Sequence, residues 1–151
     1  MTLRYSRVLV AADGSKEAAW AVKKAIDIAV RNRAALYLTY IIHDNAFGMI
    51  EAYDRTSGAR EKSYAKELLA GYQEKAVEAG VEQVDIIIER GSPKILIPQE
   101  LAPRIGADLI VCGATGLNAG ERLILGSVSE RIVRYAKCDV LVVRTDDLVT
   151  G

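Results

Sequence analysis

The chain has 151 residues and half of them are hydrophobic, which suits one domain (residues 1–151) with a sizeable buried core. Twenty basic residues balance twenty acidic ones, so the chain lacks the basic excess of a nucleic-acid binder and the basic face of a membrane-surface binder. No apolar run approaches the roughly 18 residues that cross a bilayer, and the N-terminus has no signal-peptide pattern, so we expect a cytoplasmic protein.

The first part of the chain alternates strand-length apolar runs with a helical pattern. Arg7–Ala12 is the first predicted strand, and Ser15 is placed to cap the helix that follows it. Ala35–Ile42 is rich in β-branched and aromatic residues and is the second predicted strand. Residues 43–56 have no regular pattern, and they form either a surface lid or a segment that faces a partner.

The middle of the chain continues this alternation. A long helix is predicted over about Ala59–Ala79, with an apolar stripe on one face, and Gly80 stands where a left-handed C-cap is wanted. Gln83–Glu89 is the third predicted strand. Ser92-Pro93 then has the pattern of an N-cap followed by the first residue of a helix.

The third helix carries all three prolines of the protein, Pro93, Pro98 and Pro103. Pro98 removes a hydrogen bond from the helix interior and crowds the preceding turn. We therefore expect a kink at Pro98 and a helix that ends near Pro103. Asp108–Gly113 follows as the fourth predicted strand.

The last part of the chain supplies one more helix and one more strand. Ser127 and Glu130 form the S-x-x-E pattern of a capping box, which predicts a helix that runs to about Ala136. Asp139–Arg144 is the fifth predicted strand. Near-continuous apolar strands separated by helices predict an α/β fold, an open parallel five-stranded sheet with helices on both faces and right-handed crossovers.

Metal and redox chemistry have few candidate residues. Cys112 and Cys138 lie in or beside apolar runs, far from any CxxC spacing, and are expected to be reduced and buried. His43 is the only histidine, and we expect it at the end of a strand. Without a Cys/His cluster, the sequence predicts no metal-ligating residues.

Two strand orders would place a ligand site differently, because ligands of an open parallel sheet bind beyond the carboxyl ends of the strands where the order reverses. The order 2-1-3-4-5 would favour Gly91-Ser92, after the third strand. The order 3-2-1-4-5 would pair Asp13 with Gly113, after the first and fourth strands. Gly113, Gly116 and Gly126, within residues 113–129 (GATGLNAGERLILGSVS), favour the second order.

This glycine-rich segment has the chemistry of a nucleotide site. Glycine lets backbone amides approach an anion closely, and Gly126-Ser127 lies at the start of a helix whose amides and dipole favour phosphate. Asp13 could accept hydrogen bonds from ribose hydroxyls or cap the first helix, and Ser127 is expected both to cap and to bind. Arg122 is a candidate for a γ-phosphate, although a solvated surface arginine is the commoner case. The segment is neither a G-x-G-x-x-G turn nor a G-K-[ST] loop.

The spacing G-x2-G-x9-G-S resembles the nucleotide-binding signature of the universal stress protein family, in its ATP-binding branch. The segments RVLVAADGS, GADLIVCG and AKCDVLVV extend the resemblance over nearly the whole chain. The resemblance implies a 3-2-1-4-5 sheet of the adenine nucleotide alpha hydrolase-like class. It also implies ATP, with Mg²⁺, between the ends of the first and fourth strands.

The same resemblance implies roles for individual residues. Asp13 faces the nucleoside, and the backbone around Ile41 meets the adenine edge. The glycines at 113 and 116 approach the ribose and phosphates, while Gly126, Ser127 and Val128 offer amides to the phosphates and Ser127 and Ser129 add hydroxyls. The residues expected to contact the nucleotide are Ala12, Asp13, Ile41, Gly113, Thr115, Gly116, Arg122, Gly126, Ser127, Val128 and Ser129.

Three classes of function remain open. The first is an ATP-binding regulatory protein that acts in stress response through an unknown protein client. The second is a slow ATPase or autokinase; Asp13 is the only carboxylate expected in the crevice and no histidine is available there, so fast hydrolysis is not expected. The third is a nucleotide-independent dimeric interaction module, against which the intact glycine pattern argues.

The fifth strand, Asp139–Arg144, is apolar, free of proline and expected at the sheet edge, which predicts a homodimer with these strands paired antiparallel.

Overall fold

The computed structural model describes residues 3–43, 51–114 and 126–144, with the backbone alone for residues 51–57. All strand pairs are parallel, and the five strands form one sheet in the order β3-β2-β1-β4-β5. The predicted α/β fold and strand order are therefore confirmed. The strands are β1 Arg7–Ala12, β2 Ala35–His43, β3 Val84–Gly91, β4 Leu109–Gly113 and β5 Asp139–Val143.

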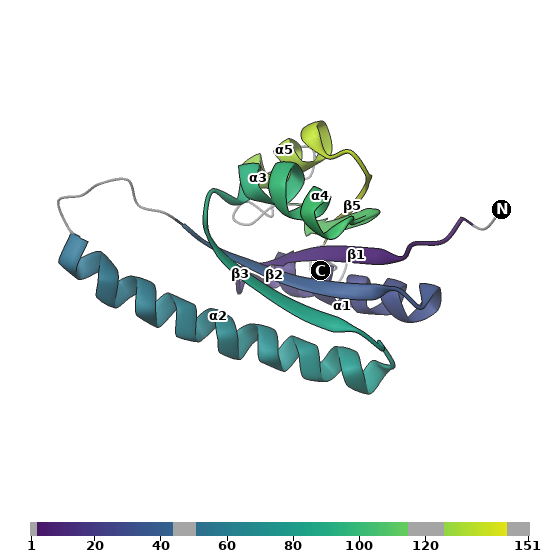
Figure 1. Ribbon diagram of the computed structural model, residues 1–151, viewed down its shortest axis with the longest axis horizontal. Coiled ribbons are helices and arrows are strands. Elements are labelled where there is room, and N and C mark those ends of the chain that lie inside the picture. The colour runs from purple at the N-terminus through teal and green to yellow at the C-terminus, as the bar shows by residue number, and fades with distance from the viewer. Residues whose placement is uncertain (1–2, 44–50, 115–125, 145–151) are drawn as a thin grey trace, which may run out of the picture.

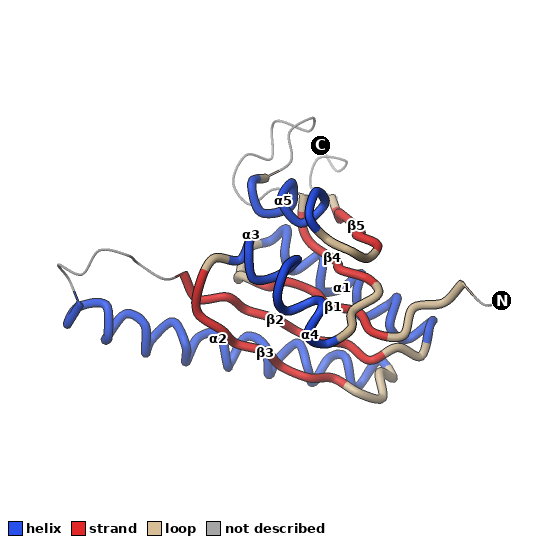
Figure 2. Tube along the Cα trace, turned by 45° about the horizontal axis from the view of Figure 1, so that its top comes forward, coloured by secondary structure: helices blue, strands red, loops and turns tan. Residues whose placement is uncertain are grey.

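Helices cover both faces of this sheet. α1 (Lys16–Asn32) and α2 (Glu51–Ala79) lie on one face (Figure 1). The other face carries α3 (Pro93–Leu96), the π-helical turn η2 (Ile97–Leu101), α4 (Ala102–Ile105) and α5 (Ser127–Tyr135). Figure 2 shows this three-layer arrangement from a second direction, with α3 and α4 in front of the strands and α1 behind them.

The strands have two buried faces, which explains their near-continuous apolar sequences. Successive side chains of a strand point to opposite faces, so Val8 and Val10 pack toward α1 and α2. Leu9, between them, packs on the other face with Ile110 and with Ile132 of α5. All five side chains are fully buried. Two apolar layers, one on each side of the sheet, hold the helices in place.

The beginning of α1 is the one predicted. Ser15 is its N-cap, and the Ser15 hydroxyl oxygen accepts a hydrogen bond from the Ala18 N–H over 3.1 Å. Ser92 likewise precedes Pro93 as the N-cap of α3, although its side chain makes no capping hydrogen bond. Gly80 follows α2 with a φ of 112°, a conformation that a side chain would strain.

One helix boundary differs from the prediction. α2 begins at Glu51 rather than near Ala59, so residues 51–56, expected to be irregular, are helical. The first residues of α2 project beyond the carboxyl ends of the strands (Figure 1). Because this part of the helix does not pack on the sheet, its sequence needs no apolar stripe. Residues 44–50, the rest of the segment interpreted as a lid or partner-facing region, lie outside the described residues.

The proline-containing helix is irregular at Pro98 and ends at Ile105, two residues after Pro103, as expected. The helix widens into the π-helical turn η2, in which the Ala102 N–H donates to the Ile97 carbonyl five residues earlier. The wider turn gives room to the ring of Pro98, which would otherwise crowd the preceding carbonyl. The chain then continues as α4 to Ile105, and Gly106 ends it with a φ of 69°.

The cysteines and the histidine follow the expectation with one exception. Cys112 and Cys138 are both free thiols, and Cys112 is buried, which raises the pKa of its thiol to about 12. Cys138 is only half-buried, because it lies in the turn between α5 and β5 rather than inside a strand. His43 is the last residue of β2 and is exposed.

Candidate functional site

The strand order reverses between β1 and β4. From β1 the chain moves through β2 to β3, and then crosses to the other face of the sheet and returns to place β4 on the free side of β1. In an open parallel sheet this is where loops diverge and leave a crevice at the carboxyl ends of the strands. The residues that follow β1 and β4, Asp13 and Ala114, are therefore neighbours of the candidate site.

Asp13 is exposed and lies in the turn between β1 and α1. Its Oδ1 accepts a hydrogen bond from the Ser15 N–H over 2.8 Å. Ser15, not Asp13, caps α1. A carboxylate has two oxygens and several lone pairs, so this one bond leaves Asp13 with acceptor capacity for a ligand's hydroxyl groups.

The side chains of Ala12 and Ile41 are buried, so only their backbones are open to the candidate site. The Ala12 side chain is buried in the layer under α1 and α2, and the Ile41 side chain is buried on the opposite face. β1 ends opposite Tyr40, whereas β2 continues to His43 against β3. The backbone of β2 from Ile41 onward therefore runs past the end of β1, on the side that faces the crevice.

Gly113, at the end of β4, is required by packing against α1. A Cβ built on Gly113 would lie 3.0 Å from the Glu17 Cβ and 3.1 Å from the Glu17 carbonyl carbon and oxygen. Glu17 belongs to the first turn of α1, so only a residue without a side chain lets the start of that helix approach the end of β4. The approach of Gly113 to a ligand, which the resemblance implies, stays a prediction beside this packing role.

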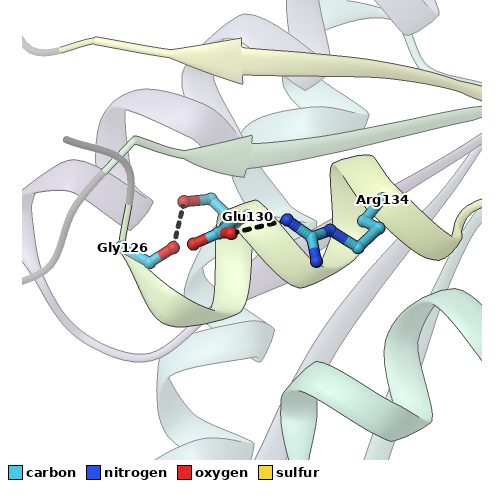
Figure 3. Close-up of polar contacts among 4 residues, drawn as sticks. Gly126, Glu130 and Arg134 are labelled. Atoms are coloured by element: carbon cyan, nitrogen blue, oxygen red, sulfur yellow. Dashed lines mark hydrogen bonds and ion pairs between the residues drawn. The ribbon is translucent and has the colours of Figure 1, made fainter. Parts of the chain in front are cut away.

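The start of α5 differs from the predicted capping box. Gly126, not Ser127, is the N-cap, and its carbonyl accepts the Glu130 N–H over 2.9 Å. The Glu130 carboxylate does not turn back to the helix start but pairs with Arg134 over 3.1 Å (Figure 3). Ser127 is thus the first residue inside the helix. Because Gly126 has no side chain, no side-chain oxygen of the N-cap satisfies the amides of Ser127, Val128 and Ser129.

Two further groups expected at phosphate make hydrogen bonds within the protein. The Gly126 N–H donates to the Ala114 carbonyl over 2.8 Å. The buried Ser129 Oγ lies 2.8 Å from the Ala114 carbonyl oxygen and 3.0 Å from that of Gly126, so its hydroxyl donates to them. Together these bonds join the end of β4 to the start of α5. The amide of Gly126 and the hydroxyl of Ser129 therefore hold the frame of the site, and neither is available to a ligand in this arrangement.

Three of the predicted site residues, Thr115, Gly116 and Arg122, lie outside the described residues. Within residues 3–43, 51–114 and 126–144, no group of three or more His, Cys, Asp or Glu side chains could hold a metal ion. The same part of the chain contains no helix that is long and apolar enough to cross a membrane.

One neighbour of the crevice did not emerge from the sequence. Tyr64 of α2 lies against Gly14, directly beside Asp13, and its phenol oxygen occupies the space that a Gly14 side chain would take. The Asp-Gly pair signalled a turn, and Gly14 has the positive φ, 84°, that such turns use. Nothing in the sequence indicated which side chain lies against this turn, because Tyr64 is distant from it along the chain.

Comparison with known proteins agrees with this fold. Residues 4–144 match the Universal stress protein family. A protein of Staphylococcus haemolyticus that bears the name of this family is 52% identical over 146 residues, which cover 97% of this chain and 88% of that protein. The chain therefore belongs to the universal stress protein family.

Solved structures of the family share the fold. The universal stress protein UspA from Lactobacillus plantarum superposes with a TM-score of 0.87 at 30% identity, over 95% of this chain and 100% of that one. A universal stress protein solved in complex with cAMP superposes with a TM-score of 0.72 at 29% identity, over 94% of this chain and 98% of that one. At least one relative with this fold thus binds an adenine nucleotide.

Proposed function

We propose that this chain is an ATP-binding regulatory protein that holds the nucleotide between the ends of β1 and β4 and acts in stress response through a protein client. One observation carries the proposal. The exposed carboxylate of Asp13 and the start of α5, whose N-cap Gly126 has no side chain, both lie where the strand order reverses. A carboxylate suits ribose hydroxyls, and helix amides suit phosphate. The cAMP complex of a 29% identical family member supports an adenine nucleotide.

The two ends of the crevice suggest how the nucleotide lies. Asp13 would accept hydrogen bonds from the ribose, and the β2 backbone that extends past β1 at Ile41 would face the adenine. The amides of Ser127, Val128 and Ser129 would meet the phosphates. Ala12 and Gly113 would line the floor through their backbones, and Thr115, Gly116, Arg122 and the Ser127 hydroxyl complete the proposed contact set.

Mg²⁺ would arrive with the nucleotide. The described residues contain no cluster of acidic side chains that could hold a metal ion, and Mg²⁺ commonly binds to phosphates and keeps several waters. When bound, the ion would neutralise part of the triphosphate charge. The residues present fit a metal ion that is bound by the nucleotide and not by the protein, since Asp13 and the α5 amides complement the ribose and the phosphates.

Isothermal titration calorimetry with Mg-ATP tests this proposal. We expect Asp13→Ala to weaken binding by about 1–3 kcal/mol, the usual range for hydrogen bonds that involve a charged group. Gly126→Val should abolish binding while the chain stays folded, because a φ of −65° at Gly126 is open to any residue and the new side chain would stand where phosphate approaches. Gly71→Ala, on the exposed side of α2, is the matched control and should bind as the parent does. Parental affinity in Gly126→Val would refute the phosphate site.

Turnover of ATP by the pure protein separates binding from catalysis. Asp13 is the one carboxylate that we assign to the crevice, and it is engaged with the Ser15 amide. It has no partner there with which to share acid and base roles. We therefore expect occupancy by ATP, rather than its hydrolysis, to alter the contacts with a client, and rapid phosphate release would contradict this.

We also propose that two copies of the chain pair through β5. β5 is the last strand at one edge of the sheet, it contains no proline, and Val140, Leu141 and Val142 are only half-buried. An apolar edge of this kind favours pairing with another strand, and a two-fold axis lets the two β5 strands pair antiparallel. Light scattering should show a dimer at micromolar concentration, and Val142→Lys should produce monomer or aggregate. A monomeric parent would refute the pairing.

A further inference from the structure

The turn that carries Asp13 is covered by a tyrosine from a distant helix. Gly14 has a φ of 84°, and a Cβ placed on it would collide with the hydroxyl of Tyr64 and lie 3.3 Å from two of its ring carbons. The backbone conformation favours glycine at position 14, and the Tyr64 hydroxyl occupies the space beside it. The contact joins α2 to the turn between β1 and α1.

The ring of Tyr64 is in contact with a second tyrosine, which is itself hydrogen-bonded to α2. Tyr40, near the end of β2, meets it edge to face, with ring centroids 6.3 Å apart and an angle of 78° between the planes. The Tyr40 hydroxyl donates a hydrogen bond to Glu61, one turn earlier in α2, over 3.2 Å. Burial, with a smaller contribution from the Glu61 charge, raises the pKa of Tyr40 to about 12, so Tyr40 remains a donor in neutral solution. Tyr64 is 47% exposed, and its contact with Tyr40 is what limits the movement of its ring.

Because the turn contains Gly14, a contact from Tyr64 can restrain its backbone. Glycine adopts more backbone conformations than any other residue, so the Asp13–Gly14 turn is not fixed by local preference alone. One hydrogen bond, from the Ser15 N–H to Asp13, constrains it from the α1 side. Tyr64 limits its movement from the α2 side. Together these two contacts restrain the turn that carries the Asp13 carboxylate.

We infer that Tyr64 is a positioning residue for the nucleoside: by packing on Gly14 it holds Asp13 in the orientation that accepts the ribose hydroxyls. The inference rests on the proposed nucleotide site and adds to it a residue outside the glycine motif. Tyr64 acts through Asp13, so its contribution should appear only with ligands that carry the hydroxyls that Asp13 binds. Phosphate contacts at α5 should not depend on it.

The test compares Mg-ATP with Mg-2′,3′-dideoxy-ATP, which lacks both ribose hydroxyls, by calorimetry on the parent and on Tyr64→Ala. We expect Tyr64→Ala to weaken ATP binding about tenfold, at the lower end of the effect of losing a hydrogen bond to a charged group. Binding of the dideoxy analogue should change less than about twofold, which is a smaller change than the loss of one ordinary hydrogen bond would cause. Tyr64→Phe keeps the ring on Gly14 and should restore most of the affinity for ATP.

Two further variants separate positioning from a loss of structure. In an Asp13→Ala background, Tyr64→Ala should cause no additional loss of ATP affinity, because the residue through which it acts is gone. Val77→Ala, at an exposed position on the same helix, should leave both affinities unchanged. If Tyr64→Ala does not fold, Tyr64→Leu carries the same comparison with a larger apolar side chain in place of the ring.

The outcomes distinguish this inference from the proposed function. A parent that binds neither nucleotide overturns the nucleotide site and this inference with it. A parent that binds both nucleotides, with equal losses for the two in Tyr64→Ala, overturns only the role of Tyr64. Additive losses in Asp13→Ala and Tyr64→Ala do the same.

Discussion

Gly113→Ala is the substitution that most directly tests why a glycine ends β4. If the glycine serves the approach of a ligand, alanine should reduce nucleotide affinity and leave stability unchanged. In the structure, however, the added methyl group would lie 3.0 Å from the Glu17 Cβ and 3.1 Å from the Glu17 backbone. Contacts that short require something to move, so we expect a loss of stability in the absence of any ligand.

The size of that loss follows from how firmly α1 is held. Glu17 lies between the N-cap Ser15 and the buried Ala18, so the first turn cannot shift without disturbing the cap and the core. Overpacking of this kind costs about 1–3 kcal/mol. Reduced freedom of the unfolded chain returns about 0.4–1 kcal/mol when alanine replaces glycine at a compatible φ. A net destabilisation of about 1–2 kcal/mol remains, which for a chain of this length lowers Tm by about 2–8 °C.

Urea unfolding followed by circular dichroism measures this difference, and Gly71→Ala provides the matched control. Gly71 lies within α2 and is exposed, and a Cβ built on it has no atom within 4 Å. The same chemical change there should stabilise the protein by about 0.5–1 kcal/mol, since alanine is the better helix former. Opposite signs for the two variants support the packing role of Gly113. A Gly113→Ala variant as stable as the parent would refute it.

Three further predictions concern buried polar groups and thiols. Ser129→Ala removes the hydroxyl that joins β4 to α5 and should lower the free energy of unfolding by about 1–2 kcal/mol in urea unfolding, because a buried hydrogen bond is lost; an unchanged midpoint would contradict it. A thiol reagent at pH 8 should label half-buried Cys138 well before buried Cys112, whose raised pKa keeps it protonated, and Cys138→Ser should leave almost no labelling of the native state. The pKa of Tyr40 in the folded chain lies above its ordinary value of 10.0, so its contribution to stability is complete below pH 10 and is lost as pH rises toward 12. Tyr40→Phe should therefore make unfolding less dependent on pH in that range, and an identical alkaline slope would exclude this role.

The sheet could be predicted from the sequence because each strand carries its own signal. The near-continuous apolar runs of β1 and β4 are buried on both faces, and burial on both faces is what such runs indicate. The start of α2 could not be predicted from the same rule. Its first turns project past the strands, so no contact with the sheet imposes a periodic pattern there (Figure 1). Pro98 was correctly expected to disturb its helix, but the wider π-helical turn that accommodates it depends on local geometry rather than on composition.

The candidate site was predictable in outline and not in its contacts. Asp13 and the start of α5 could be placed at one edge because the carboxyl ends of parallel strands lie together. The partner of Gly113 is a helix near the other end of the chain, and spacing along the sequence carries no sign of that contact. Ser129 looked like a source of a hydroxyl for phosphate, but its burial turns that hydroxyl toward the carbonyls of Ala114 and Gly126. Whether a polar group faces a ligand or the protein depends on tertiary packing.

These contacts show that Gly113 and Gly126 of the glycine motif serve the packing of the fold, whether or not a ligand is bound. Gly113 lets the start of α1 lie against the end of β4 from one face of the sheet, and Gly126 joins the start of α5 to the same strand end from the other face. The positive ends of two helix dipoles therefore converge on one crevice. The two starts are not equivalent, because Ser15 caps α1 with its hydroxyl whereas Gly126 offers α5 no side chain. A phosphate group would gain more at α5, where amides lack a capping oxygen, and the nucleoside would then extend toward Asp13 at α1.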